Sequence, residues 1–481
     1  MSSPQDYESD DTRFLLPQGV GVSTEDVERY QAGGFHPVHL GDRYDRGRYT
    51  VVHKLGAGGF STVWLARDEY EKKWVALKIV AAEHSTLVGD KCVLSRTATS
   101  SLLTSGAQGF IAEHQRQFTF EGPNGHHLCL VLPVLGPSAS DLSYGFTSRL
   151  RPWLARRVGY EATKAVADLH SRGLCHGDVT TANILFSLSD FDRFTEADIY
   201  DLFGPPATGE LETESGETPG PEAPRYIVKT LDFLSSPINI ITHDIKLVDF
   251  DQCFPVSSPP KRMLSTPLEF LAPEVAVGLA ASPASDVWAL GCCLFRLRSG
   301  VGPFENPYEV TSPVDLMRYV IQTLGDMPRE WQQILWDDDG KPTKDPSKGK
   351  LLCKWEGQRP LKTLLYQIWD EPEGRVVQTG TAKPEDEDWI ANDEDRNPFP
   401  PCFSDMMWKP TAVKVDNLYL HGYDREWLTL SEGIPKIPEH EADLLYDLLS
   451  RIFVYDPERR PSAREVLSHP WFHMDGHDTC A

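Results

Sequence analysis

Three oxygen-bearing side chains near the middle of the chain have a spacing that suits phosphate chemistry. Asp178 and Asn183 lie in the segment Cys-His-Gly-Asp-Val-Thr-Thr-Ala-Asn-Ile-Leu, and Asp249 follows the apolar pair Leu247-Val248. An aspartate at this place can accept the proton of an attacking hydroxyl, and an asparagine five residues later can hold a metal ion. A lone H-x-D means little, but H-x-D-x-x-x-x-N is more specific. Oxygen ligands such as Asp249 suit Mg²⁺, which bridges the phosphates of a nucleotide.

A glycine-rich segment precedes these residues and fits the same chemistry. It reads Gly-Ala-Gly-Gly-Phe-Ser-Thr-Val over residues 56–63, and glycines there let backbone N–H groups approach phosphate oxygens. Ser61 replaces the third glycine of G-x-G-x-x-G, so the segment alone could also be an ordinary hairpin. Lys78 follows in the run Val-Ala-Leu-Lys, where a lysine that pairs with phosphates is expected. Together the two features favour a nucleotide site.

The elements around these residues change from strands to helices along the chain. Alternation predicts strands near residues 49–55, 62–66 and 74–80, with Val75, Leu77 and Ile79 on one face and Lys78 on the other. From Pro152 the pattern is helical and ends at Gly173. Its apolar residues recur at spacings of three and four: Leu154, Val158, Ala162, Ala165, Val166 and Leu169. The fold class predicted is α+β, β-rich first and helical afterwards.

Two stretches look like insertions. Residues 187–245 contain the acidic, low-complexity run from Glu210 to Pro224, which predicts a mobile loop. Residues 305–440 mix helical signals with acidic clusters at 337–339, 385–388 and 393–395. Each cluster is either a solvated face or part of a surface that binds a basic partner.

At this point the sequence resembles the eukaryotic protein kinases, over residues 40 to 473. Ala272-Pro273-Glu274 is similar to the motif that closes the activation segment, with Arg460 as its ion-pair partner, and Asp286 to the residue that braces the catalytic loop. The His-Pro-Trp-Phe ending at 469–472 fits as well. The resemblance implies a two-lobed kinase fold: an extension (1–49), a β-rich N-lobe (50–136), a helical C-lobe with the two inserts (137–473) and a tail (474–481).

Segments outside the general kinase core resemble one branch, the SR-protein kinases and particularly their fungal relatives. These segments are 33–38, 41–42, 54–56, 60–66, 121–125, 127–131 and 135–137, and an insert before the metal-binding aspartate fits the same branch. Members of this family phosphorylate serines in the Arg/Ser repeats of splicing factors. The resemblance therefore implies Arg/Ser-rich protein substrates and a part in mRNA processing.

The resemblance also assigns roles to single residues. Asp178 is the catalytic residue that orients the substrate hydroxyl, and Asn183 and Asp249 hold Mg²⁺. ATP is the second cofactor, with its adenine between Ala76 and the hinge at Leu135. The residues expected to bind ATP are Leu55, Gly56, Ala57, Gly58, Gly59, Phe60, Ser61, Thr62, Val63, Ala76, Lys78 and Leu135.

Several positions depart from the kinase pattern. Gly177 occupies the position where most protein kinases have an arginine. Thr180 replaces a lysine that contacts the γ-phosphate, and Asp251 replaces the glycine of Asp-Phe-Gly. The glutamate that should pair with Lys78 has no clear counterpart, Asp90 aligning best and Glu83 second. Asp251 and the missing glutamate support an alternative, a pseudokinase scaffold that binds nucleotide or basic partners without efficient transfer. A third reading is a small-molecule phosphotransferase, because His-Gly-Asp with Asn183 resembles the antibiotic and choline kinases.

Composition limits the partners and the compartment. The 481 residues carry a formal charge of −24, which argues against direct binding of nucleic acid or an anionic membrane and suits basic partners. Nine cysteines without a C-x-x-C pair indicate reduced thiols, and the N-terminus lacks a secretory signal. We expect a monomer without a membrane anchor, in the cytoplasm and nucleus.

Overall fold

The computed structural model describes two compact units, each assembled from separate stretches of chain. The described residues are 13–15, 17, 19–20, 25–85, 109–143, 148–306, 309–371, 401–408, 414–415, 418–419 and 434–474. A β-rich unit comprises residues 1–96, 112–135 and 188–240. A helical unit comprises residues 97–111, 136–187 and 241–481. The predicted succession of strands and then helices is confirmed.

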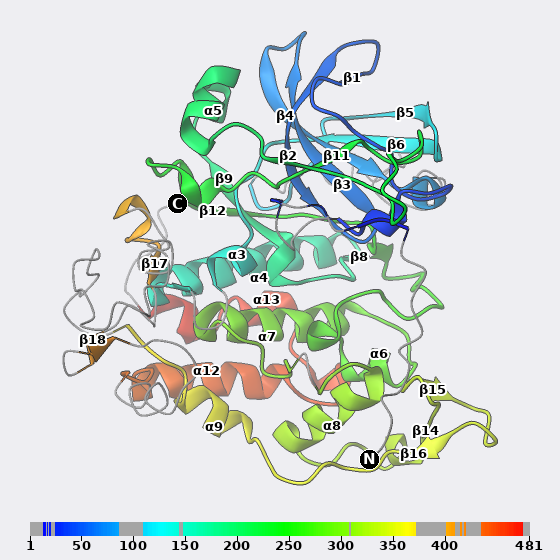
Figure 1. The fold of residues 1–481 in the computed structure, drawn as a ribbon. Helices are drawn as coiled ribbons and strands as arrows, with labels where there is room; N and C mark the ends of the chain where they lie inside the picture. The colour runs from blue at the N-terminus through cyan, green and yellow to red at the C-terminus, as the bar shows by residue number, and fades with distance from the viewer. Residues whose placement is uncertain are drawn as a thin grey trace. The chain divides into compact units, whose positions relative to one another are not determined.

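The β-rich unit is built on a six-stranded antiparallel sheet (Figure 1). In spatial order its strands are β1 (Arg43–Tyr44), β2 (Tyr49–Ala57), β3 (Ser61–Asp68), β4 (Lys73–Val80), β6 (Gly125–Leu132) and β5 (Arg116–Gly122). Strands β2, β3 and β4 are the three that the alternation predicts. Val75, Leu77 and Ile79 of β4 are buried in one core with Trp64 and Val131. Burial of each such side chain stabilises the folded state by about 1.5–3 kcal/mol. This burial determines which face of β4 points into the core and, because side chains alternate, which face points away from it.

The described residues before β1 form part of the β-rich unit. The short helix η1 (Val27–Arg29) begins after Asp26, whose side chain accepts the N–H of Glu28. A second apolar cluster joins this extension to the chain after β4 and to the first insert. Its members are Phe14, Val20, Val27, Tyr30, Phe35, Ala81, Leu211, Ala223 and Ile227.

The first insert is ordered, so the prediction of a mobile loop over 187–245 is wrong. It contains α5 (Glu196–Phe203), which begins with a capping box at Thr195, and the strand pair β10 (Thr208–Glu210) and β11 (Tyr226–Val228). Its residues 188–240 belong to the β-rich unit, and β12 (Ile241–Leu247) to the helical unit. Apolar side chains such as Leu211 and Ile227 are almost fully buried. The free energy gained by burying these side chains exceeds the conformational entropy that is lost when the polar run between them is ordered.

The helical unit is centred on α4 (Pro152–Ser171) and α7 (Pro283–Ser299). The predicted helix from Pro152 to Gly173 is confirmed, and the six apolar residues of its predicted periodic pattern are buried. The further helices are α3 (Ala139–Leu142), α6 (Pro273–Ala276), α8 (Pro313–Leu324), α9 (Leu361–Tyr366), α12 (Glu439–Ile452) and α13 (Ala463–Val466) (Figure 1). Two short strand pairs carry the catalytic segments: β8 (Leu174–Cys175) with β13 (Phe254–Pro255), and β9 (Ile184–Leu188) with β12.

The second insert is described in part. A small sheet of β14 (Leu335–Trp336), β15 (Pro342–Thr343) and β16 (Lys350–Leu351) follows α8. The acidic clusters at 385–388 and 393–395 lie outside the described residues. Further short strands are β7 (Arg149–Leu150) with β17 (Met407–Trp408), and β18 (Lys414–Val415) with β19 (Leu418–Tyr419). Among the helices in the described ranges, none is both long and apolar enough to cross a bilayer.

Candidate active site

The glycine-rich segment forms the turn between β2 and β3. Gly58 N–H donates to the carbonyl of Ser61 at 2.9 Å and closes the turn. A Cβ placed on Gly56, Gly58 or Gly59 would meet no heavy atom within 4 Å, and none of the three has a positive φ. The glycines are therefore not needed for backbone conformation or internal space. They leave the backbone of the turn uncovered by side chains, so that phosphate oxygens can approach it closely.

Lys78 and Ala76 occupy the face of β4 opposite the apolar core. Lys78 pairs across the sheet with Val63 of β3, and Ala76 with Leu65, so the two residues have apolar neighbours on that face. Lys78 is 6% exposed and Ala76 5%. Of the residues predicted to bind ATP, Val63, Ala76 and Lys78 thus share one face of the sheet, beside the glycine turn. Leu135 is the last residue of its stretch in the β-rich unit, at the point where the chain passes to the helical unit.

Of the two carboxylates predicted as partners of Lys78, the structure describes Glu83 but not Asp90. Glu83 is half exposed, and its Oε1 accepts from Arg29 at 2.8 Å. Asp90 lies outside the described residues. Glu83 is therefore engaged by the N-terminal extension.

The catalytic segment in the helical unit is held from α7. Both carboxylate oxygens of Asp286 accept backbone N–H groups, from His176 at 2.8 Å and from Gly177 at 2.9 Å. His170 Nε2 lies 2.9 Å from Asp286 Oδ2. Burial opposes ionisation, but the hydrogen bond and charge of His170 hold the pKa of Asp286 below its ordinary value. The brace implied by the kinase resemblance is confirmed.

Asp178 and Asn183 contact each other directly. Asn183 Nδ2 donates to the backbone carbonyl and to Oδ2 of Asp178, both at 2.9 Å. Among the described residues, Asp178 Oδ1 is buried without a hydrogen-bond partner, since the nearby Thr266 hydroxyl, which favours the ionised carboxylate, donates to the Gly177 carbonyl. Burial, followed by the negative charge of Asp249, raises the pKa of Asp178 to about 6. Asp178 is therefore ionised at neutral pH and has one oxygen left to accept a hydroxyl proton.

Asp249 is tied to the same segment through its neighbours. Val248 N–H donates to the carbonyl of Asn183 at 2.9 Å, and His176 Nε2 lies 3.0 Å from the Val248 carbonyl. Phe250 is buried and packs on the His176 ring, with centroids 4.8 Å apart. Asp249 itself has a φ of 63°, a left-handed conformation that is uncommon for non-glycine residues and concentrates at functional sites.

The side chains of Asp178, Asn183 and Asp249 fit a hard divalent cation. The amide nitrogen of Asn183 is used by Asp178, which leaves its amide oxygen available as a ligand, and Asp249 is close enough for its negative charge to act on Asp178. An all-oxygen set of this kind suits Mg²⁺ better than a soft metal. The structure thus brings together the three residues predicted for catalysis and metal binding.

Two departures from the kinase pattern have local structural reasons. Gly177 has a φ of +78°, and a Cβ there would lie 2.6 Å from the carbonyl oxygen of Gln252. No arginine can therefore occupy this backbone position without movement of residue 252. Thr180 is 3% exposed and caps the helical turn η2 (Thr181–Asn183) by accepting the N–H of Asn183. It supports Asn183, the asparagine predicted to bind the metal, instead of supplying a charge.

Two residues of this site have no role in the sequence prediction. Thr266 Oγ1 donates to the carbonyl of Gly177 at 2.6 Å, so the activation segment contacts the catalytic segment. His176 connects Val248 and Phe250 to that segment. His176 stands in the recognised H-x-D pattern, whereas no local pattern marks Thr266.

A family model for the protein kinase domain matches residues 49–201 and 236–472. The chain belongs to the protein kinase family, and its curated relatives include kinases of the SR-protein branch, as the motifs predict.

Three relatives illustrate the similarity. Protein kinase dsk1 of Schizosaccharomyces pombe is 32% identical over 44% of this chain and 40% of its own length. Serine/threonine-protein kinase SRPK of Physarum polycephalum is 28% identical over 93% of this chain and 91% of its own. Human SRSF protein kinase 3 is 42% identical over 23% of this chain and 20% of its own. The match spans less than half of dsk1 and about a fifth of the human kinase.

Proposed function

We propose that the chain is an ATP- and Mg²⁺-dependent kinase that phosphorylates serines in Arg/Ser-rich proteins, and so acts on mRNA processing in the cytoplasm and nucleus. The observation that carries the proposal is the Asp178 carboxylate, ionised at neutral pH, with Oδ2 bonded to Asn183 and Oδ1 buried without a partner in the described structure. This is the arrangement that a group needs to receive a hydroxyl proton.

The reaction is a single displacement. The serine oxygen bonds to the γ-phosphorus of ATP while the bond to the β-phosphate oxygen breaks, and ADP leaves. Asp178 Oδ1 accepts the hydrogen bond of the serine hydroxyl and takes its proton as the new bond forms. Asn183 keeps Oδ2 occupied, so that Oδ1 is the oxygen presented. Asn183 and Asp249 would hold a divalent ion, and this ion would supply positive charge to the phosphates.

The substrate class follows from the charge and from the relatives' names. A chain with a net charge of −24 attracts and holds an arginine-rich segment. The human relative is named as a kinase of SRSF proteins. The acidic cluster at 337–339 is a weak candidate for docking, because Asp337 accepts the N–H groups of Asp339 and Lys341 and Asp338 pairs with Lys350.

Two observations separate the proposal from its rivals. The buried pair of Glu274 with Arg460 and the Asp286 brace are protein-kinase features, which argues against a small-molecule phosphotransferase. The contacts among Asp178, Asn183 and the segment of Asp249 are intact, which favours transfer over a pseudokinase scaffold.

The test is phosphate transfer from ATP to an Arg/Ser-repeat peptide, with a Lys/Ser peptide and Asp178→Asn protein alongside. We expect transfer that prefers the Arg/Ser peptide, disappears in the variant, stops with EDTA and returns with Mg²⁺. Transfer to neither peptide by folded, nucleotide-binding protein would favour the pseudokinase. Equal transfer to both peptides would refute the proposed substrate class but would still support the kinase activity.

A further inference from the structure

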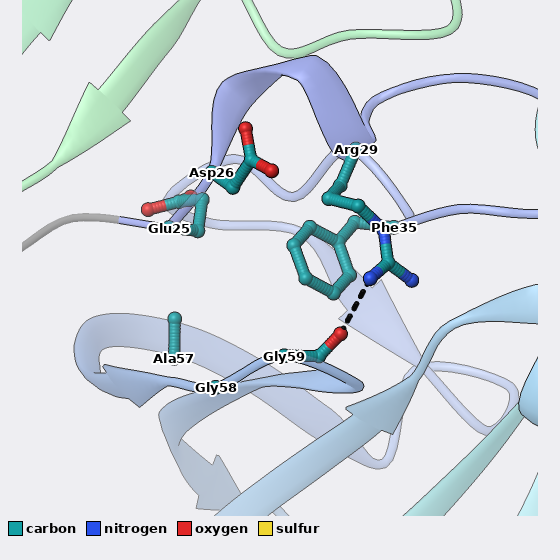
Figure 2. A pocket seen from close by; sticks show the side chains of 7 residues that line it. All are labelled: Glu25, Asp26, Arg29, Phe35, Ala57, Gly58 and Gly59. Atoms are coloured by element: carbon teal, nitrogen blue, oxygen red, sulfur yellow. Dashed lines mark hydrogen bonds between the residues drawn. The ribbon is translucent and has the colours of Figure 1, made fainter. Parts of the chain in front are cut away.

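The glycine turn is held from outside the sheet by one arginine of the N-terminal extension. Arg29 Nη1 donates to the carbonyl of Gly59 at 2.7 Å, and Figure 2 shows this bond reaching down to the tip of the turn. Arg29 Nη2 donates to Glu83 Oε1 at 2.8 Å. The same guanidinium stacks on Phe35, with its central carbon 5.0 Å from the ring centroid. One side chain therefore links the turn to the chain that follows β4.

The segment that carries Arg29 is held in place by hydrogen bonds and an ion pair. Glu25 pairs with the fully buried Lys54 of β2, and Tyr30 Oη donates to Glu25 at 2.7 Å. The backbone after η1 also binds the chain after β4, because the carbonyls of Gly33 and Gly34 accept the N–H groups of Glu83 and Ala82. Arg29 thus projects from a segment that is fixed on both sides of it.

Phe60 anchors one side of the turn, because its carbonyl accepts the N–H of Ala81 at 2.9 Å and its ring packs on His84, whereas the tip has few contacts. Ala57, Gly58 and Gly59 are exposed, and the turn's glycines have no side chains to pack. A cavity of about 160 Å³ lies between the turn and the extension (Figure 2). It is lined by Glu25, Asp26, Arg29, Phe35, Ala57, Gly58 and Gly59. Arg29 supplies the hydrogen bond that spans this cavity, from the extension to the Gly59 carbonyl at the tip of the turn.

The bond also has an electronic effect. The carbonyl of Gly59 and the N–H of Phe60 belong to one peptide group. A cation that hydrogen-bonds to the carbonyl polarises this group and makes its N–H a stronger donor. Phe60 is among the residues expected to cover the phosphates, so the charge of Arg29 reaches the nucleotide through the backbone.

We propose that Arg29 is a positioning residue that fixes the glycine turn for nucleotide binding by joining the Gly59 carbonyl to Glu83. The inference rests on the proposed ATP-dependent function, but it concerns nucleotide affinity and can be tested without turnover. It gives the extension a part in the reaction that the kinase pattern does not assign.

The experiment measures ATP affinity by direct binding of a fluorescent ATP analogue, together with KM for ATP, kcat and the melting temperature. Arg29→Ala should weaken nucleotide binding and raise KM for ATP about 10-fold, the effect of losing a hydrogen bond to a charged group. KM for the peptide should not change. Arg29→Lys, which keeps the charge and one donor, should recover part of the affinity.

The matched control is Arg48→Ala. Arg48 binds Asp68 at 2.7 Å at the end of β3 that is remote from the glycine turn. This variant should melt at a lower temperature and bind nucleotide normally. The inference is overturned if Arg29→Ala behaves like Arg48→Ala, with lower stability and unchanged ATP affinity.

Glu83→Gln provides a second variant should Arg29→Ala not fold. It removes the ion pair and leaves the extension's backbone bonds, and it should weaken ATP binding by a smaller factor than Arg29→Ala. Unchanged ATP affinity in Glu83→Gln would also overturn the inference, because the proposal requires the link from Arg29 to Glu83. A wild type that binds ATP but transfers nothing would refute the proposed function alone, whereas a wild type that binds no nucleotide would refute both.

Discussion

Glu274 and Arg460 are 186 residues apart in sequence and form a two-bonded ion pair, Nη1 to Oε1 and Nη2 to Oε2, both at 2.7 Å. The two side chains are 2% and 0% exposed. Arg460 also donates to the carbonyls of Val454 and Ala284, and Ser285 Oγ donates to Glu274. The pair therefore connects the end of the activation segment, the start of α7 and the chain before α13.

Removing one partner of this pair should be costly. Arg460→Met leaves the Glu274 carboxylate buried with a single hydroxyl donor, and we expect a loss of about 3–5 kcal/mol in the free energy of unfolding, measured in urea. Arg451→Met is the control, because Arg451 and Asp447 form an exposed pair whose loss should cost at most about 1 kcal/mol. Equal losses in the free energy of unfolding would contradict the prediction that the buried pair stabilises the fold more than the exposed pair.

Asp178 should be required for transfer and not for nucleotide binding. Asp178→Asn keeps the size of the side chain and the bond to Asn183 but cannot take a proton. We expect kcat to fall by a factor of about 100 to 10,000, with ATP affinity nearly unchanged. Steady-state kinetics and nucleotide titration on the same preparations check this. Full activity of the variant would remove Asp178 as the proton acceptor.

The buried pair of Glu25 and Lys54 should respond to a double substitution. Glu25→Gln leaves the Lys54 ammonium, 0% exposed, without a counter-charge, and should destabilise the protein by about 3–5 kcal/mol. Adding Lys54→Met removes the stranded charge, so the double variant should be more stable than Glu25→Gln alone. Thermal or urea unfolding measures both. Additive losses would show that the two side chains do not act as a pair.

His36 should make stability depend on pH. Its ring contacts Tyr44, Phe120 and His127, and its Nδ1 is buried without a hydrogen-bond partner in the described structure. Burial, with repulsion from His127 and His39, lowers the pKa of His36 to about 3.

The sign follows from proton binding. Between pH 6.5 and 3 the unfolded chain protonates this histidine and the folded chain does not, so stability falls as the pH drops below 6.5. The slope is at most about 1.4 kcal/mol per pH unit. His36→Phe should reduce the slope of unfolding free energy between pH 7 and 5.

Local sequence pattern predicts much of this fold because the relevant signals are short. The spacing in α4 and the alternation in β4 each lie within one element. Asp178 and Asn183 meet because five residues separate them. Glu274 with Arg460 and the Asp286 brace are distant in sequence, and the kinase resemblance was needed to predict them.

The remaining features depend on contacts that no short window contains. The first insert is ordered because Trp74 Nε1 donates to the Phe194 carbonyl and Leu231 N–H to the Lys54 carbonyl, bonds between segments more than 100 residues apart. The run from Glu210 to Pro224 has the composition of a loop, and only its few buried apolar residues show otherwise. Arg29 reaches Gly59 through the placement of η1, which a sequence pattern does not encode.

The division of the β-rich unit among three stretches of chain has a consequence during translation. A ribosome that has delivered residue 135 must add about 100 residues before residue 240 completes the unit, which takes roughly 5–20 s at ordinary elongation rates. During that interval Phe14, Val27 and Tyr30 lack the side chains of Leu211 and Ile227 that complete their cluster. The nascent polypeptide therefore exposes apolar surface while the catalytic loop is being synthesised, and this is the stage at which chaperones would recognise it.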